Sequence, residues 1–201
     1  RRCAEKLGFR AVFLRANPLV DQQWQSDYYD PLWDALEALN LSLGFHESTG
    51  TGKNQIGERL EPNFMLRRVY AQPFEQMLAL GCFCAGGVFA RHPKLRVAFL
   101  EANCSWLPWL LWRLDEAWGL DGDVFAPDLK MKPSEYFKRH CVVSIEPDEV
   151  IANNVITQVG NGNLVFSTDY PHVDSRYPEA VNHFLRLPLS QEDKRKILWD
   201  N

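Results

Sequence analysis

Short runs of β-favouring residues alternate along this chain with stretches that have helical spacing, and this alternation most constrains the fold. The runs are apolar at nearly every position, which is typical of strands buried on both faces of a parallel sheet. Such an order predicts an α/β domain with helices packed outside the sheet. The predicted strands are 10–14, 41–46, 96–101, 141–146 and 163–169. The predicted helices are 31–39, 63–91, 106–118, 148–159, 177–186 and 190–199.

Two α/β architectures fit this order, a doubly wound open sheet and a (β/α)8 barrel. No G-x-G-x-x-G follows the first strand, and no G-x-x-x-x-G-K-[ST] occurs anywhere in the sequence. Gly50-Thr51-Gly52-Lys53 lacks the spacing of a phosphate-binding loop. We therefore expect the 201 residues to form part of a single barrel domain, although a closed barrel needs about eight strand-helix units and five are visible.

Composition and charge indicate the kind of partner. Hydrophobic residues make up 46% and charged residues 24% of the chain, as in an ordinary globular protein. The formal net charge of -4 provides no attraction to nucleic acid or to an anionic membrane. The longest uncharged apolar run, 77–90, is shorter than the roughly 20 residues that a membrane span needs. We expect a small-molecule substrate, no nucleic-acid or membrane partner, and leave homo-oligomer formation open.

The five cysteines are odd in number and scattered, without the paired spacings of a disulfide framework or a zinc module. They are Cys3, Cys82, Cys84, Cys104 and Cys141. We interpret them as free thiols in a reducing compartment and expect a cytoplasmic protein. Cys82 and Cys84 lie within an apolar helical stretch, where packing in the core is the expected role.

Each predicted strand is closed by an ionisable residue. These residues are Arg15, His46, Glu101, Glu146 and Asp169. The carboxyl ends of parallel strands meet at one edge, so the five side chains are expected to line a shared pocket. Imidazole and carboxylate groups are ligands for a divalent cation, which can activate a bound water. Two long loops, 47–62 and 119–133, are also predicted, and the first leaves from this edge.

Each of these residues also has a structural interpretation. His46 can be a hydrogen-bonded structural residue, and Asp169 can cap a helix. Arg15 and Glu146 can neutralise one another. Glu101 has the stronger functional case, because an unpaired carboxylate is costly to bury after an apolar strand. The histidines away from this edge are predicted to have no functional role; they are His92, His140 and His183.

Four passages of the sequence, taken in order, carry a resemblance. The first is Asp27-Tyr28-Tyr29-Asp30-Pro31-Leu32-Trp33, leading to Leu41-Ser42-Leu43-Gly44-Phe45-His46. The second is His92-Pro93-Lys94-Leu95-Arg96-Val97 with Glu101 and Trp106-Leu107-Pro108. The third is Phe166-Ser167-Thr168-Asp169-Tyr170-Pro171-His172, and the fourth is the closing Asp193-Lys194-Arg195-Lys196-Ile197-Leu198-Trp199-Asp200-Asn201. Together they resemble the amidohydrolase-related family of metal-dependent enzymes, and the third is similar to the most specific signature of that family.

The resemblance implies a barrel whose strands four to eight and their helices are present here. In that family a His-x-His or Glu-x-His pair from strand one, a His after strand five and an Asp after strand eight hold the metal. His46 and Asp169 match the last two, whereas the sequence has no H-x-H or E-x-H. We therefore expect the remaining ligands upstream, and expect these residues alone neither to fold stably nor to bind metal tightly. The expected ion is zinc, with manganese and iron as alternatives.

Glu101 departs from the family pattern, because decarboxylases of the family commonly place a His there. This departure favours hydrolysis, in which Asp169 binds the metal and shuttles a proton while Glu101 acts as a base or a further ligand. The resemblance makes His172 a substrate-orienting residue, and Arg15 is a candidate for pairing with a substrate carboxylate. The alternatives are non-oxidative decarboxylation of an aromatic or unsaturated carboxylate, and a metal-free paralogue that binds a ligand.

Overall fold

Five short strands form one parallel sheet in which the spatial order equals the order along the chain. The computed structural model describes residues 1–46 and 55–201. The strands are β1 (Ala11–Leu14), β2 (Ser42–Phe45), β3 (Val97–Phe99), β4 (Cys141–Ile145) and β5 (Leu164–Phe166). All five predicted strands are therefore confirmed, each shorter than predicted. The strand order does not reverse, so the doubly wound alternative is wrong for these strands and the α/β class is confirmed.

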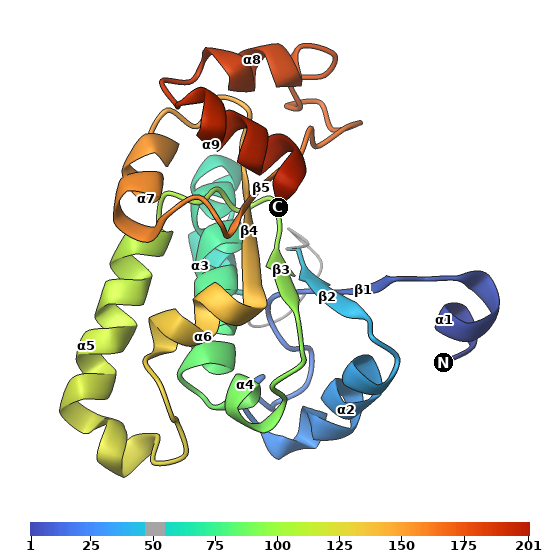
Figure 1. Cartoon of the computed structure of the whole chain (residues 1–201), viewed down its shortest axis with the longest axis vertical. Helices are drawn as coiled ribbons and strands as arrows, with labels where there is room; N and C mark the ends of the chain where they lie inside the picture. The colour runs from blue at the N-terminus through green and yellow to red at the C-terminus, as the bar shows by residue number, and fades with distance from the viewer. Residues whose placement is uncertain (47–54) are drawn as a thin grey trace.

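Helices connect successive strands. Figure 1 shows α3, α5, α6 and α7 gathered on one side of β3 and β4, while α1 stands away from the sheet on an extended arm. Right-handed crossovers that always step in the same direction place their helices on the same face of a sheet. The α-helices are α1 (Arg2–Leu7), α2 (Asp30–Ala38), α3 (Phe64–Cys84), α4 (Val88–Arg91), α5 (Leu107–Phe125), α6 (Pro133–His140), α7 (Ala152–Val159), α8 (Ala180–Arg186) and α9 (Gln191–Arg195). Shorter 3-10 turns occupy Asp27–Tyr29 and Ile56–Leu60, and a π-turn occupies Lys196–Asp200.

The core lies between the sheet and the helices. Side chains alternate along a strand, and Leu43, Phe45 and Phe99 are fully buried toward the helices. The Phe45 ring lies 5.6 Å from that of Phe99 and 5.3 Å from that of Phe83 on α3. Burying each such ring contributes about 1.5–3 kcal/mol. The other face is less covered, and Phe13 of β1 is 59% exposed.

The predicted single helix over 63–91 is wrong, because it is interrupted after Cys84. Gly87 has a φ of 84°, a left-handed conformation that favours glycine, and the next helix begins directly after it. A Cβ on Gly86 would lie 2.5 Å from the carbonyl oxygen of Cys82. The first part begins as predicted, because the Asn63 side chain accepts a hydrogen bond from the backbone N–H of Leu66 at 3.1 Å.

The stretch Phe64–Arg91 is long and apolar enough, by length and composition, to cross a membrane. The core helix of a globular domain meets the same criterion. In this structure Ala79, Leu80 and Phe83 are buried in the core, and Gln76 donates a hydrogen bond to the carbonyl of Leu100, directly after β3. We therefore assign α3 to the core.

The predicted loop over 119–133 is also wrong. Helix α5 continues to Phe125, and α6 follows from Pro133, so the connection is 126–132. Helix α6 was not predicted, although Pro133 suits the first helical position and Glu135 accepts a hydrogen bond from the backbone of Lys132 at 2.9 Å. Of the predicted loop over 47–62, residues 47–54 lie outside the described part of the chain.

Two helix starts near the C-terminal end differ from the prediction and one agrees. Helix α7 begins at Ala152 rather than at 148, because Asp148 forms an ion pair with Arg176 at 2.8 Å instead of capping the helix. Helix α8 begins at Ala180 rather than at 177. Ser190 caps α9 as predicted, accepting a hydrogen bond from the backbone N–H of Asp193 at 3.0 Å.

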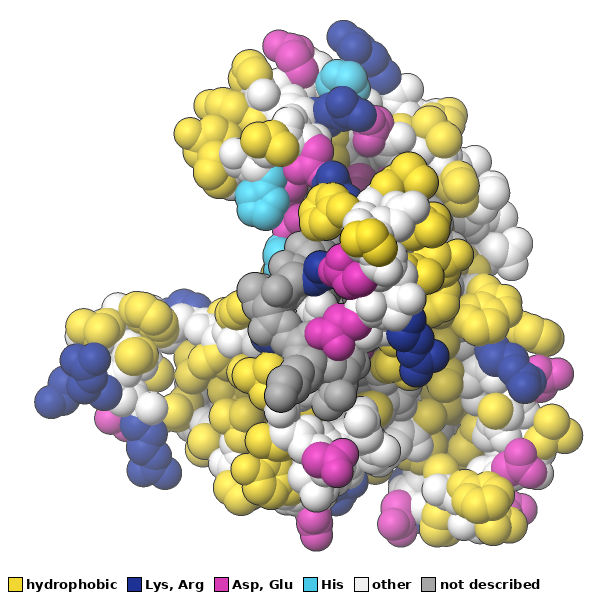
Figure 2. All heavy atoms as spheres, turned by 180° about the vertical axis from the view of Figure 1, so that it is seen from behind, with side chains coloured by type: hydrophobic (Ala, Val, Ile, Leu, Met, Phe, Trp, Pro, Cys, Tyr) yellow, Lys and Arg dark blue, Asp and Glu magenta, His cyan; other side chains and the backbone are white. Residues whose placement is uncertain are grey.

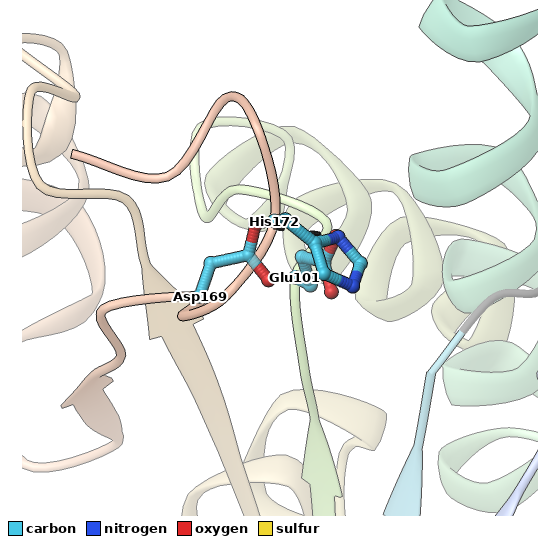
Figure 3. A group of neighbouring side chains, drawn as sticks. All are labelled: Glu101, Asp169 and His172. Atoms are coloured by element: carbon cyan, nitrogen blue, oxygen red, sulfur yellow. Dashed lines mark ion pairs between the residues drawn. The ribbon is translucent and has the colours of Figure 1, made fainter. Parts of the chain in front are cut away.

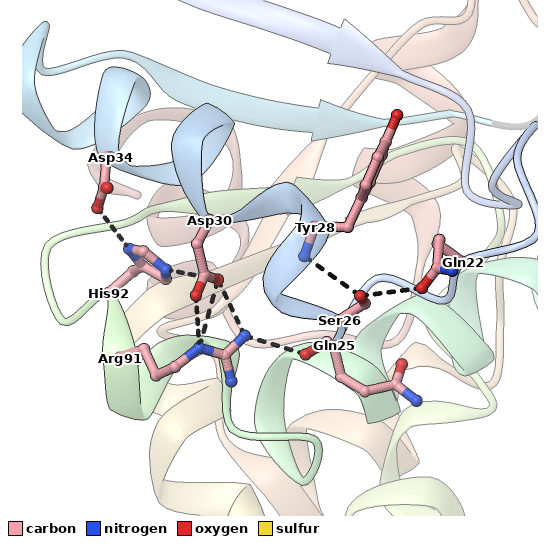
Figure 4. A network of polar contacts seen from close by, with 8 residues as sticks. All are labelled: Gln22, Gln25, Ser26, Tyr28, Asp30, Asp34, Arg91 and His92. Carbon is pink, nitrogen blue, oxygen red and sulfur yellow. Dashed lines mark hydrogen bonds and ion pairs between the residues drawn. The ribbon is translucent and has the colours of Figure 1, made fainter.

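A polar network joins α2 to the end of α4 (Figure 4). The carboxylate of Asp30 accepts hydrogen bonds from Arg91 at 3.0 Å and from Nε2 of His92 at 3.0 Å. Burial raises the pKa of Asp30, but the hydrogen bonds from Arg91 and His92 outweigh it and lower the pKa. Asp30 and His92 belong to two of the resembling passages, and here they have a structural role. All five cysteines are free, as predicted.

Candidate metal centre

Side chains from three strand ends meet at one edge of the sheet. Nε2 of His46, directly after β2, contacts a carboxylate oxygen of Glu101, which follows β3. Nδ1 of His172 lies 3.7 Å from an oxygen of Glu101 and 3.7 Å from one of Asp169, which follows β5. Figure 3 shows Glu101, Asp169 and His172 turned toward one another. The structure thus brings together four of the residues singled out in the sequence.

The backbone at this edge is unusual and is held by neighbouring elements. Glu101 and Asp169 both have a φ of 57°, in the left-handed region that costs a side-chain-bearing residue about 1 kcal/mol or more. The N–H of Glu101 donates to Oγ of the buried Ser144 at 2.7 Å. Gln76 donates to the carbonyl of Leu100 at 2.5 Å. These contacts from β4 and α3 fix the direction of the Glu101 side chain.

The electrostatics of the site show a surplus of negative charge. Burial raises the pKa of Glu101, but the hydrogen bond from His46 and the charges of His46 and His172 outweigh burial and lower it. Burial and the charge of Glu101 raise the pKa of Asp169. Burial, with the charges of Glu149, Asp169 and Glu101, raises the pKa of Glu146 to about 7. A cation placed among these carboxylates would be stabilised by all of them.

Some residues of the site were not found from the sequence. Glu149 is buried and accepts hydrogen bonds from the backbone N–H groups of Cys104 and Ser105, both at 2.9 Å, which joins the loop after β3 to the loop after β4. Gln72 donates to Glu101 at 3.4 Å. The four-residue spacing of Gln72 and Gln76 was the available signal, because residues four apart in a helix share a face.

A cavity of about 380 Å³ opens beside the cluster and is lined by Gln72, Glu101, Glu146 and Asp169, among others. Figure 2 shows histidine and acidic side chains side by side in a hollow of the surface. Glu146 therefore reaches the shared pocket, as predicted, and lies among carboxylates. Arg15 instead lines a different cavity of about 360 Å³ beside Trp24 and Tyr28. Arg15 follows β1, the edge strand of the described sheet, and its predicted part in the shared pocket stays a prediction.

The donor set fits a divalent cation. Glu101, Asp169 and His172 each offer a ligand atom, and these atoms lie within 4.8 Å of one another. His46 adds a second imidazole through its contact with Glu101. Mixed imidazole and carboxylate donors suit zinc, manganese and iron. The mutual repulsion of the carboxylates is a cost that a bound cation would remove.

These features define a class, that of α/β proteins with a candidate metal centre at the carboxyl edge of a parallel sheet. The sequence model of the amidohydrolase family matches residues 1–201, so the chain belongs to that family. The resemblance found in the sequence is thereby confirmed.

Known relatives agree with this assignment. The chain is 26% identical over 206 residues to 2-amino-3-carboxymuconate-6-semialdehyde decarboxylase of Dictyostelium discoideum, covering 100% of this chain and 54% of the relative. It therefore spans about half the length of that protein. Among solved structures it resembles 5-carboxyvanillate decarboxylase from Sphingomonas paucimobilis, with a TM-score of 0.81 and 23% identity over 98% of this chain and 58% of that one.

A second solved structure has a bound metal. Dihydroxybenzoic acid decarboxylase from Polaromonas sp. JS666, with bound manganese and the inhibitor 2-nitroresorcinol, has a TM-score of 0.73 and 21% identity. The alignment covers 99% of this chain and 61% of that one. At these identities the likeness to the two solved structures establishes the fold.

Proposed function

We propose that the full-length protein is a metal-dependent decarboxylase of a small aromatic or unsaturated carboxylate. The observation that carries the proposal is the meeting of His46, Glu101, Asp169 and His172 beside a cavity of about 380 Å³. The names of the relatives support it, because each is a decarboxylase of a carboxylate-bearing compound. Decarboxylation is therefore our leading hypothesis for the function. It replaces hydrolysis, which the sequence favoured.

His46 and Asp169 would hold the cation, with Glu101 completing the donors that this chain provides. When bound, a divalent cation supplies a Lewis acid that polarises a substrate oxygen and stabilises developing negative charge. Zinc, manganese and iron all suit these donors, and zinc stays a prediction. The manganese in the Polaromonas structure makes that ion the first one to test.

The reaction requires a proton source within the cavity. The bond from carbon to the carboxylate breaks, carbon dioxide leaves, and the electron pair that stays on carbon takes a proton. Glu101 is a poor proton donor because its lowered pKa keeps it ionised at neutral pH, and it accepts a hydrogen bond from the imidazole of His46. His172 is the better-placed donor, since Nδ1 is 3.7 Å from both carboxylates and its side chain is half-exposed.

We further propose that β1 to β5 are strands four to eight of a closed barrel. Three observations support this: the unreversed parallel order, the helices on one face, and the exposed Phe13 on the other face. The family relatives are also about twice as long as this chain. A preceding strand would then supply the remaining metal ligands.

Hydrolysis is the second candidate, and a specific observation favours it. Glu101 follows β3. Its pKa is lowered because the hydrogen bond from His46 and the charges of His46 and His172 outweigh the effect of burial. An ionised carboxylate at neutral pH is a competent general base for a water molecule.

Carbon dioxide release separates the two candidates. Manganese-loaded full-length protein is incubated with a panel of carboxyl-labelled hydroxybenzoates and with a parallel panel of aryl esters and amides. We expect labelled carbon dioxide from at least one acid, lost in Asp169→Asn and kept in His183→Ala, which alters a histidine on α8. Cleavage of esters or amides with no carbon dioxide from any acid would refute decarboxylation and favour hydrolysis.

A further inference from the structure

One face of α3 carries a row of polar residues toward the strand ends. Arg68, Gln72 and Gln76 are spaced four apart, so they project from the same side of the helix. Gln76 bonds to the backbone before Glu101, and Gln72 bonds to the Glu101 carboxylate. Arg68 continues the row and forms an ion pair with Asp174, which lies five residues beyond Asp169 on the loop after β5. The row therefore runs from the buried side of the site to its rim.

Arg68 is the one Lys or Arg of the described residues that lines the cavity beside the metal centre. Every other charged residue lining that cavity is acidic. These residues are Glu101, Glu146, Asp169 and Asp174. Arg15 lines a different cavity, and Arg176 lines a neighbouring one and pairs with Asp148. An anionic molecule entering this cavity meets repulsion from the carboxylates and attraction from a single side chain, that of Arg68.

We propose that Arg68 is a specificity-determining residue that binds the carboxylate of the substrate, which takes the place of Asp174. The substrate class rests on the function proposed above. Breaking the ion pair between Arg68 and Asp174 costs little free energy. Both side chains are partly exposed, 50% for Arg68 and 40% for Asp174, and such ion pairs contribute only about 0–1 kcal/mol. A guanidinium can bind a carboxylate through two parallel hydrogen bonds, so the carboxylate of a ligand can replace that of Asp174.

The exchange explains the position of both residues. Asp174 keeps the Arg68 side chain over the cavity when no anion is bound. Because Asp174 and the metal ligand Asp169 lie on the same loop, the pair also sets the guanidinium beside the place where substrate would meet the cation. Ligands that carry a carboxylate are then selected over uncharged ligands of the same shape.

Calorimetric binding to the manganese-loaded full-length protein tests the proposal with salicylate and its uncharged amide, salicylamide. Arg68→Met is expected to weaken salicylate binding about 10- to 100-fold, the loss of a charge-assisted pair, and to change salicylamide binding less than about threefold. Asp174→Asn is expected to strengthen salicylate binding severalfold, because the competing carboxylate is gone. Arg176→Met is the matched control, since it removes an equally exposed, paired arginine nearby, and it should leave both affinities within about twofold.

The binding experiment tests the role of Arg68 independently of the proposed decarboxylation, because binding needs no turnover. Equal losses for salicylate and salicylamide in Arg68→Met, a loss as large in Arg176→Met, or no salicylate binding to the wild type would each overturn the role of Arg68. If the charge preference depends on Arg68 while no carbon dioxide is released from any acid, the inference stands and decarboxylation fails.

Discussion

Glu146 is a carboxyl group whose protonation is strongly altered by the fold. It follows β4, is half-buried, and lies among the carboxylates of Glu149, Asp169 and Glu101, and these causes raise its pKa from 4.5 to about 7. Glu149 is only three residues from Glu146 in the sequence, but Asp169 and Glu101 follow other strands, so the local sequence indicates only part of this effect. A residue with this pKa is neutral over part of the range in which other carboxylates are ionised.

Stability should therefore depend on pH through Glu146 in the metal-free full-length protein. The folded state keeps the proton up to about pH 7 and the unfolded state loses it near 4.5, so the free energy of unfolding falls between these values as pH rises. Glu146→Gln removes this loss. We expect it to be as stable as wild type at low pH and about 1–2 kcal/mol more stable near pH 8, after allowance for partial exposure.

Denaturant titrations at several pH values measure this difference. Glu5→Gln on α1 is the control, because that carboxylate is exposed and far from the cluster, and its stability difference should be flat with pH. A Glu146→Gln difference that is equally flat, or that favours wild type at high pH, would show that burial does not control this carboxyl group.

The sequence was informative for His46, Glu101 and Asp169 for one reason. Each lies within three residues of the end of a strand, and the carboxyl ends of all strands in a parallel sheet lie at the same edge. Arg15 follows the same rule but ends the edge strand, and lies in another cavity. Arg68 reaches the cavity from a helix, and which side of a helix faces the sheet depends on packing that residue spacing alone does not determine.

At the scale of the elements, apolar periodicity predicted what the core requires. All five strands and most helices were found because they bury apolar side chains. Helix α6 was missed although its buried Pro133, Tyr136 and Phe137 have helical spacing, because its eight residues contain only one such repeat. The break before α4 was missed because it depends on the left-handed backbone of Gly87, which does not alter the apolar pattern.

The pairing of strand β1 on its outer side tests the proposed barrel. An edge strand leaves half of its amides without partners, whereas a strand inside a barrel is paired on both sides. In the full-length protein we expect the amide hydrogens of β1 to exchange as slowly as those of β2, its neighbour in the sheet. Hydrogen exchange measured by mass spectrometry compares the two strands in one sample. Exchange of β1 within seconds, while β2 stays protected, would contradict a barrel that continues beyond β1.

The whole molecule combines a parallel sheet, a helical layer on one face and a cluster of imidazoles and carboxylates at the carboxyl edge. Strain is concentrated at the same edge, where Glu101 and Asp169 have left-handed backbone conformations. Buried polar contacts from Ser144 and Gln76 hold that strained backbone in place. Such a site sacrifices stability for a fixed arrangement of ligands, as functional sites commonly do.

If this cluster of imidazoles and carboxylates holds a divalent cation, the metal content of the protein should depend on its ligands. The manganese content of four full-length proteins is measured by mass spectrometry after incubation with manganese and desalting. They are wild type, His46→Ala, Asp169→Asn and the control His183→Ala. We expect about one manganese ion per chain in wild type and His183→Ala, and a loss of about tenfold or more in affinity on removing either ligand. Wild-type manganese content in both His46→Ala and Asp169→Asn, with their folds intact, would contradict this expectation.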